Sequence, residues 1–140
     1  SIQIFILLLQ IAISIHSNKN IIMFVEEPEQ NLHPSLQSRL ADLFYEVWNM
    51  TKGKVRFVVE THSEYLVRKM QVIVANAILS ERKSIDKVNQ DIKVYYFPDK
   101  KEPYPMVFKN NGRFQNKFGQ GFFDESSRAN YELVLLENRD

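Results

Sequence analysis

The first segment of the chain is strongly apolar and has the periodicity of a helix. Its apolar residues recur at spacings of three and four, which predicts a helix over residues 3–17 with one face turned toward the core. A histidine on such a face is more often packed than functional. The predicted inner face consists of Ile2, Phe5, Ile6, Leu9, Ala12, Ile13 and His16.

Two short apolar runs without alternation follow, at residues 21–25 and 55–59. Such runs are typical of strands that are buried on both faces of a parallel sheet. A helix is predicted between them over residues 34–49, because Pro34 suits a first helical position. Strand, helix and strand at this spacing predict a right-handed crossover unit with parallel strands. The predicted inner face of the helix is Leu36, Leu40, Leu43, Phe44 and Val47.

A third helix is predicted from a cap at Ser63 to about residue 80, with Glu64 in its first turn. These elements predict an α/β fold with a mainly parallel sheet and flanking helices. They fill residues 1–80, and residues 81–140 are expected to complete the same lobe. The predicted inner face of the third helix is Leu66, Val67, Met70, Ile73, Val74 and Ala77.

The pattern weakens toward the C-terminus, where Pro and Gly mark turns. Aromatic residues are frequent there, and we interpret them as packing residues rather than as a platform for nucleic-acid bases. The elements predicted in this part are a charged linker or short helix at 81–90, strands at 92–97 and 106–109, a turn at Asn110-Asn111-Gly112 and a short closing helix at 128–136.

Composition narrows the possible functions only slightly. The chain has 140 residues, a length that suits one globular core. Its net charge of +1 argues neither for nor against a nucleic-acid surface. It has no Cys, which excludes disulfides, thiol nucleophiles and Cys-based metal sites, and fits a reducing compartment. The apolar residues 2–15 are fewer than the roughly 20 that a membrane span needs. We therefore expect a cytoplasmic protein without a membrane partner.

Polar and ionisable residues follow directly after both predicted strands. Glu26-Glu27 ends the first strand, and Glu60-Thr61-His62 ends the second. Because parallel strands present their carboxyl ends at one sheet edge, these residues are expected to converge there. Paired carboxylates suit a divalent cation and an attacking water, since one can hold the ion while the other accepts a proton. This edge of the sheet, which we call the rim, is therefore the candidate site.

These residues resemble the ABC-type ATPases of the structural-maintenance-of-chromosomes and OLD (overcoming lysogenization defect) kind. Residues 21–27 look like a Walker B strand, Asn31-Leu32-His33-Pro34 looks like a D-loop, and Glu60-Thr61-His62-Ser63 looks like the switch segment. Ser1-Ile2-Gln3 resembles the end of the signature motif. The tail Gly119-Gln120-Gly121-Phe122-Phe123-Asp124-Glu125 is similar to a bacterial subfamily of these ATPases.

The resemblance implies a role for each matching residue. Glu26 would orient Mg²⁺, and Glu27 would polarise the water that attacks ATP. His62 would contact the γ-phosphate. Asn31 and His33 would act across a homodimer interface, and Ser1 and Gln3 would contact the nucleotide of the opposite subunit. The implied fold is the C-terminal lobe of an ABC-type P-loop ATPase, with DNA or a nuclease as a possible partner.

One part of such an ATPase is missing from the sequence. Phosphate binding needs Gly-x-x-x-x-Gly-Lys-Ser/Thr, the Walker A loop, and the four glycines of this chain lie at positions 53, 112, 119 and 121. We therefore expect this chain to be inactive alone and to act with an N-terminal half that carries Walker A. Because the first residue is Ser1 rather than Met, we expect that half in the same polypeptide.

Two alternatives stay open. The chain could be a non-catalytic interaction or regulatory module that keeps the ATPase fold and docks a partner through Phe122 and Phe123. It could also be a metal-dependent hydrolase that uses Glu26, Glu27, Glu60 and His62 without ATP.

Overall fold

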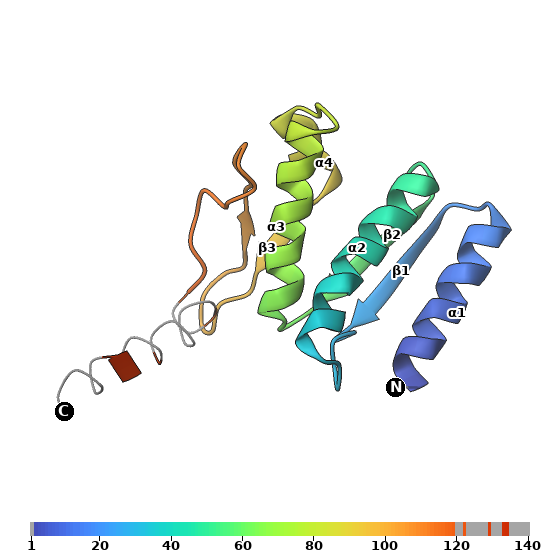
Figure 1. Cartoon of the computed structure of the whole chain (residues 1–140), viewed down its shortest axis with the longest axis horizontal. Helices are drawn as coiled ribbons and strands as arrows, with labels where there is room; N and C mark the ends of the chain where they lie inside the picture. The colour runs from blue at the N-terminus through green and yellow to red at the C-terminus, as the bar shows by residue number, and fades with distance from the viewer. Residues whose placement is uncertain (1, 120–121, 123–128, 130–132, 135–140) are drawn as a thin grey trace. The chain divides into compact units, whose positions relative to one another are not determined.

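The chain forms two compact units, Ser1–Asn76 and Ala77–Asp140, and each contains its own two-stranded sheet. A computed structural model describes residues 2–119, 122, 129 and 133–134 (Figure 1). The division between the units falls within helix α3 (Glu64–Leu79). One sheet is parallel and the other antiparallel, so a mainly parallel sheet stays a prediction, as does the assignment of residues 81–140 to the same lobe.

The first unit contains the predicted strand–helix–strand element. Helix α1 (Ile2–Ser17) leads to β1 (Ile21–Glu26), and α2 (Pro34–Met50) connects β1 to β2 (Val55–Glu60). The two strands pair in parallel over their whole length, from Ile21 opposite Val55 to Glu26 opposite Glu60. The predicted helices and strands of this unit, and the parallel pairing, are confirmed.

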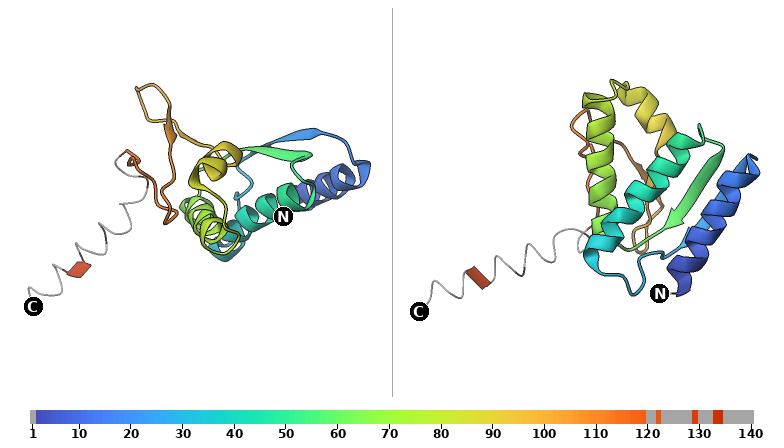
Figure 2. Two further views of the ribbon diagram at one scale, coloured as in Figure 1. Left: turned by 90° about the horizontal axis from the view of Figure 1, so that it is seen from above. Right: turned by 45° about the vertical axis from the view of Figure 1, so that its right-hand side comes forward.

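Helices cover one face of the parallel sheet. Met23, Val25, Phe57 and Val59 pack against a core that α1, α2 and α3 supply, and Figure 2 shows α1 and α2 on the same side of the strands. The side chains in between point the other way and are exposed, and Phe24 reaches 81%. The expectation that both strand faces are buried is therefore wrong for this chain, because the described residues cover one face only.

Helix α1 buries a different face from the predicted one. Leu7, Ile11 and Ser14 are buried, whereas every residue of the predicted inner face, His16 included, is exposed. Leu7 and Ile11 join the core cluster, and Ser14 Oγ lies 3.8 Å from the sulfur of Met23 on β1, so this face of the helix is turned toward the sheet. The prediction failed because the helix is apolar almost all the way round, so spacing alone could not select a face.

The other two long helices agree better with their predicted faces. Leu40, Phe44 and Val47 of α2 are buried, but Leu36 is 47% exposed because it lies in the first turn, before the part of the helix that packs on the core. The α3 face is confirmed, with Met70 partly buried and the rest buried, namely Leu66, Val67, Ile73, Val74 and Ala77.

The second unit is built around a small antiparallel sheet. Helix α4 (Ile85–Asp91) confirms the short-helix alternative, and β3 (Val94–Tyr96) pairs with β4 (Tyr104–Met106). The strand predicted at 106–109 is found at 104–106 and shares only Met106 with the prediction. Pro105 lies within it, because a two-stranded sheet tolerates a missing N–H. Gly112, with a φ of 77°, confirms the turn. The predicted helix at 128–136 lies largely outside the described residues.

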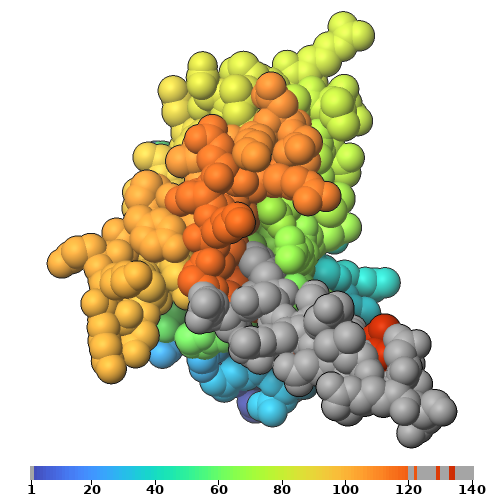
Figure 3. Space-filling model, turned by 90° about the vertical axis from the view of Figure 1, so that its left-hand side faces the viewer, coloured from blue at the N-terminus to red at the C-terminus, as the bar shows by residue number. Residues whose placement is uncertain are grey.

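Aromatic side chains pack against one another in the second unit, part of whose surface is seen in orange in Figure 3. The Tyr96 ring lies 5.2 Å from that of Phe118, which stacks on Phe122 at 4.6 Å. Phe108 is fully buried, and Asn89 both donates to its carbonyl and accepts from its N–H. These contacts confirm packing for Tyr96, Phe108, Phe118 and Phe122, whereas Tyr95 and Phe97 are exposed.

No helix among the described residues is long and apolar enough to cross a membrane.

Leu40 and Leu36 of α2 allow a matched test of which face holds the core. We expect Leu40→Ala to lower the free energy of unfolding by about 2–5 kcal/mol, because Leu40 is buried. Leu36→Ala should cost well under half as much, because that side chain is already 47% exposed. Urea unfolding followed by circular dichroism measures both, and equal losses would contradict the assigned face.

Candidate site at the carboxyl edge of the parallel sheet

The candidate site begins where the two parallel strands end. Glu26 and Glu60 are register partners, and the backbone N–H of Glu27 donates to the carbonyl of Glu60 at 2.9 Å. Side chains of register partners project to the same face of a sheet, so Glu26 and Glu60 present two exposed carboxylates together. The pairing therefore brings the ends of two segments more than thirty residues apart to one rim.

The backbone turns sharply at Glu27. Its φ of 40° lies in the left-handed region, which is uncommon for a residue with a side chain and often marks functional sites. The carbonyl of Glu27 accepts from the N–H of Gln30 at 3.1 Å, and its side chain accepts from the Gln30 amide. This turn directs the Glu27 carboxylate away from the strand and toward the second segment.

His62 meets Glu27 across the rim. The Nε2 atom of its ring lies 3.2 Å from Oε1 of Glu27, with the His62 side chain 74% exposed and that of Glu27 31% exposed. The predicted convergence of Glu26-Glu27 with Glu60-Thr61-His62 is therefore confirmed as geometry. The pair combines a carboxylate and an imidazole that remain open to a ligand.

Glu29 is a third acid at this rim, and the sequence pattern did not single it out. Its side chain is only 9% exposed, and its Oε1 accepts from the backbone N–H of His62 at 2.7 Å. The other oxygen, Oε2, is buried and has no hydrogen-bond partner within the described part of the chain. An acid a few positions after a strand end resembles a surface residue in sequence, so the pattern of apolar and polar residues did not indicate its burial.

A second set of hydrogen bonds, formed by Ser63, lies next to the bond between Glu29 and His62. Ser63 Oγ donates to Oε1 of Gln37 at 2.6 Å and accepts from the N–H of Leu66, which caps α3 as predicted. Gln37 in turn donates to the carbonyl of Leu32 at 2.9 Å. Ser63 and Gln37 therefore join the start of α3 to the start of α2.

The other predicted site residues that the structure describes lie in the loop between β1 and α2 and in the first turn of α1. His33 is the N-cap of α2, where its Nδ1 accepts from the N–H of Ser35 at 3.3 Å. Asn31 is exposed and has a φ of 60°, which Asn tolerates better than most residues. Gln3 is exposed in the first turn of α1, and Ser1 lies outside the described residues.

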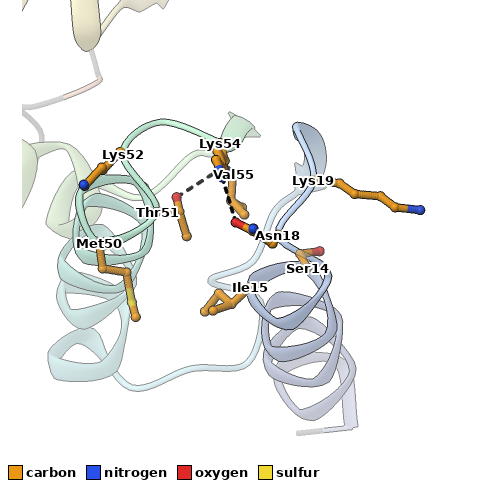
Figure 4. Close-up of a pocket in the computed structure, with 9 residues that line it drawn as sticks. All are labelled: Ser14, Ile15, Asn18, Lys19, Met50, Thr51, Lys52, Lys54 and Val55. Carbon is orange, nitrogen blue, oxygen red and sulfur yellow. Dashed lines mark hydrogen bonds between the residues drawn. The ribbon is translucent and has the colours of Figure 1, made fainter.

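A separate hollow lies at the opposite end of the same strands. It has a volume of about 300 Å³ between the ends of α1 and α2, and three lysines line it. Figure 4 shows Lys54, whose Nζ donates to Oδ1 of Asn18 at 2.7 Å. Lys19 and Lys52 are exposed. Since this hollow lies at the amino ends of the strands, it is separate from the rim.

The comparisons with known proteins point to the part of the chain that contains the rim. Residues 1–67 match the AAA ATPase domain family. The match includes Glu26, Glu27 and His62 and stops within α3. It supports a general ATPase-family role, and such families bind a nucleotide, usually with Mg²⁺. No curated protein matches the chain, and no solved structure does either.

The rim offers oxygen donors of the kind that bind Mg²⁺. Mg²⁺ prefers one or two carboxylates, with phosphate oxygens and waters as its other ligands. Glu26 and Glu60 offer exposed carboxylates on register partners. Among the described residues, no three His, Asp or Glu side chains form a cluster that could hold an ion by themselves. Glu26 and Glu60 are therefore a pair of donors of the kind that a divalent cation can use.

Ser63 should contribute to stability more than an exposed cap does. We expect Ser63→Ala to lower the free energy of unfolding by about 1–2 kcal/mol, because it removes the cap of α3 and leaves Gln37 Oε1 without its donor. Ser84 caps α4 at the surface, so Ser84→Ala should cost less. Urea unfolding of the two variants makes the comparison, and a smaller loss for Ser63→Ala would contradict the assigned cross-link.

Proposed function

We propose that this chain is the C-terminal part of an ABC-type ATPase, similar to the structural-maintenance-of-chromosomes and OLD proteins, that binds and hydrolyses ATP with Mg²⁺. The observation that carries the proposal is the Glu27–His62 pair at the carboxyl edge of parallel strands, inside the segment that matches the AAA ATPase domain. ATP hydrolysis needs little covalent chemistry from the protein, and depends on positioned groups and electrostatic stabilisation. The rim supplies groups of this kind.

Each rim residue has a proposed task. Glu26 orients the Mg²⁺ and its waters, since its exposed carboxylate ends β1. Glu27 polarises the attacking water and accepts its proton. His62 holds the terminal phosphate through its exposed ring. Mg²⁺ held at Glu26 would neutralise charge on the phosphate oxygens.

The loop and α1 residues are proposed to act across a dimer. Asn31 and His33 lie in the exposed loop between β1 and α2, where a second subunit can reach them. Ser1 and Gln3 are assigned to the nucleotide of the opposite subunit. DNA or a nuclease is the proposed partner of the assembled enzyme, and this part of the proposal rests on the resemblance to the family.

The exposed face of the parallel sheet supports the presence of a further segment that packs on it. Ile22, Phe24 and Val58 are exposed there by 55%, 81% and 51%. A contiguous apolar surface of this kind usually marks an interface. We therefore assign this face to the segment that carries Walker A, which the sequence of this chain does not contain. That segment would supply the phosphate-binding loop and complete the sheet.

The alternative of a non-catalytic module has less support in the structure. It assigns partner docking to Phe122 and Phe123, yet the Phe122 ring stacks on Phe118 and lies 5.9 Å from the ring of Tyr96. A ring used in this way holds the second unit together. Phe123 lies outside the described residues.

Glu27→Gln tests the catalytic proposal in a polypeptide that carries this chain behind its own Walker A segment. We expect at least a hundredfold loss of ATP turnover with ATP binding retained, because the amide cannot accept a proton yet keeps the size of the side chain. Phosphate release and fluorescent-nucleotide binding measure the two quantities. The coding sequence upstream of Ser1 should contain Gly-x-x-x-x-Gly-Lys-Ser/Thr.

Two results would contradict this proposal. Unchanged turnover in Glu27→Gln would leave the non-catalytic module as the better interpretation. Hydrolysis of a phosphoester by the 140-residue chain alone, abolished by a chelator, would favour the metal-dependent hydrolase.

Phe24→Glu tests the open sheet face. We expect the stability of the 140-residue chain to change by less than about 0.5 kcal/mol, because the ring is 81% exposed. The same variant should no longer co-purify with a separately expressed Walker A segment, since it places a charge in the proposed interface. Phe97→Glu is the matched control, because that ring is 74% exposed in the second unit. Retained co-purification of Phe24→Glu would contradict the assignment.

A further inference from the structure

The buried carboxylate of Glu29 has no role in the function proposed above. It lies between the turn that follows β1 and the segment that follows β2, and its Oε1 binds the backbone N–H of His62 across that gap. Its position is fixed from its own side as well, because the Glu29 carbonyl accepts from the N–H of Leu32 at 3.0 Å. The turn after β1 therefore fixes Glu29, and Glu29 in turn fixes the segment that follows β2.

Stability alone does not explain a carboxylate at this position. The bond to the His62 N–H is charge-assisted and favourable, but Oε2 is buried and has no partner in the described part of the chain. A half-satisfied buried carboxylate costs free energy that a fully satisfied or apolar side chain would not. Such groups in native proteins call for a functional explanation.

The geometry around His62 supplies a functional explanation for Glu29. The side chain is 74% exposed, so packing does not hold the ring, and its position depends on the backbone that carries it. That backbone is anchored by the β2 pairing on one side and by the Ser63 cap on the other. The bond from the His62 N–H to Glu29 anchors the residue itself, and it ties His62 to the same turn that presents Glu27.

We propose that Glu29 is a positioning residue that sets the distance between His62 and Glu27 by fixing the His62 backbone to the β1 turn. The chemical use of that distance rests on the proposed ATPase function, but the positioning itself does not. Glu29 acts through the backbone N–H of His62, which its side chain binds, and not through the imidazole ring.

Amide hydrogen exchange of the ¹⁵N-labelled 140-residue chain tests the positioning without any nucleotide. In Glu29→Ala, exchange of the His62 amide should become at least about tenfold faster relative to the amides of β2, and the His62 ring resonances should shift, because the acceptor is gone. Glu29→Gln keeps a carbonyl oxygen that can accept, so most of the protection should return.

Leu40→Ala is the control for a general loss of stability, because Leu40 is a core residue of α2. It should accelerate the β2 and His62 amides together and leave the His62 ring resonances in place. The proposal is overturned if Glu29→Ala behaves like Leu40→Ala, or if Glu29→Gln fails to restore the His62 amide.

Turnover in the Walker A-bearing polypeptide separates this inference from the proposed function. Glu29→Ala should lower kcat about tenfold or more with KM within about twofold, and Glu29→Gln should recover most of kcat. An unchanged kcat, in an enzyme that Glu27→Gln does inactivate, would overturn the catalytic use of Glu29. Turnover unaffected by Glu27→Gln would instead reject the ATPase proposal and leave the exchange result as the test of positioning.

Discussion

The parallel register of β1 and β2 is the constraint on which the candidate site depends. Because Glu26 lies opposite Glu60, the residues that follow each strand leave the sheet at the same level. A shift of the register by one residue would turn the apolar side chains of a strand away from the helices and move its final acid to the other face. The buried positions of β1 and β2 thus fix where Glu27 and His62 meet.

The loops convert this alignment into a defined pair of side chains. The strands alone bring the backbone of Glu27 to the carbonyl of Glu60. The left-handed turn at Glu27 then directs its carboxylate toward the second segment, and Glu29 and Gln37 bind the backbone of His62 and the hydroxyl of Ser63. The rim is therefore shaped by a left-handed turn and by hydrogen bonds between polar groups, whereas the core of the unit is held by apolar packing.

Sequence patterns predicted the elements well and the buried faces less well. The apolar runs and turn residues located β1, β2 and α2 because local spacing carries that information. The face of α1 could not be predicted, since its apolar residues surround the helix and its rotation depends on contacts such as Ser14 with Met23. Whether both faces of a strand are buried also could not be predicted from the sequence of the strand, because this depends on how many layers cover the sheet.

The same distinction applies to the site. Topology brings Glu27 and His62 together, whereas the proposed role of Glu29 comes from its burial and its bond to the backbone, which residue type and spacing do not reveal.

The proposed catalytic pair of Glu27 and His62 needs both accessibility and a fixed distance, and these requirements oppose each other. Burying the His62 ring would fix it but close it to a ligand, so the exposed ring must be held through its backbone instead. An acceptor-only carboxylate from the neighbouring turn suits this purpose, because it binds the N–H without occupying the space in front of the ring. The unsatisfied oxygen of Glu29 is then the energetic cost of keeping the pair both open and aligned.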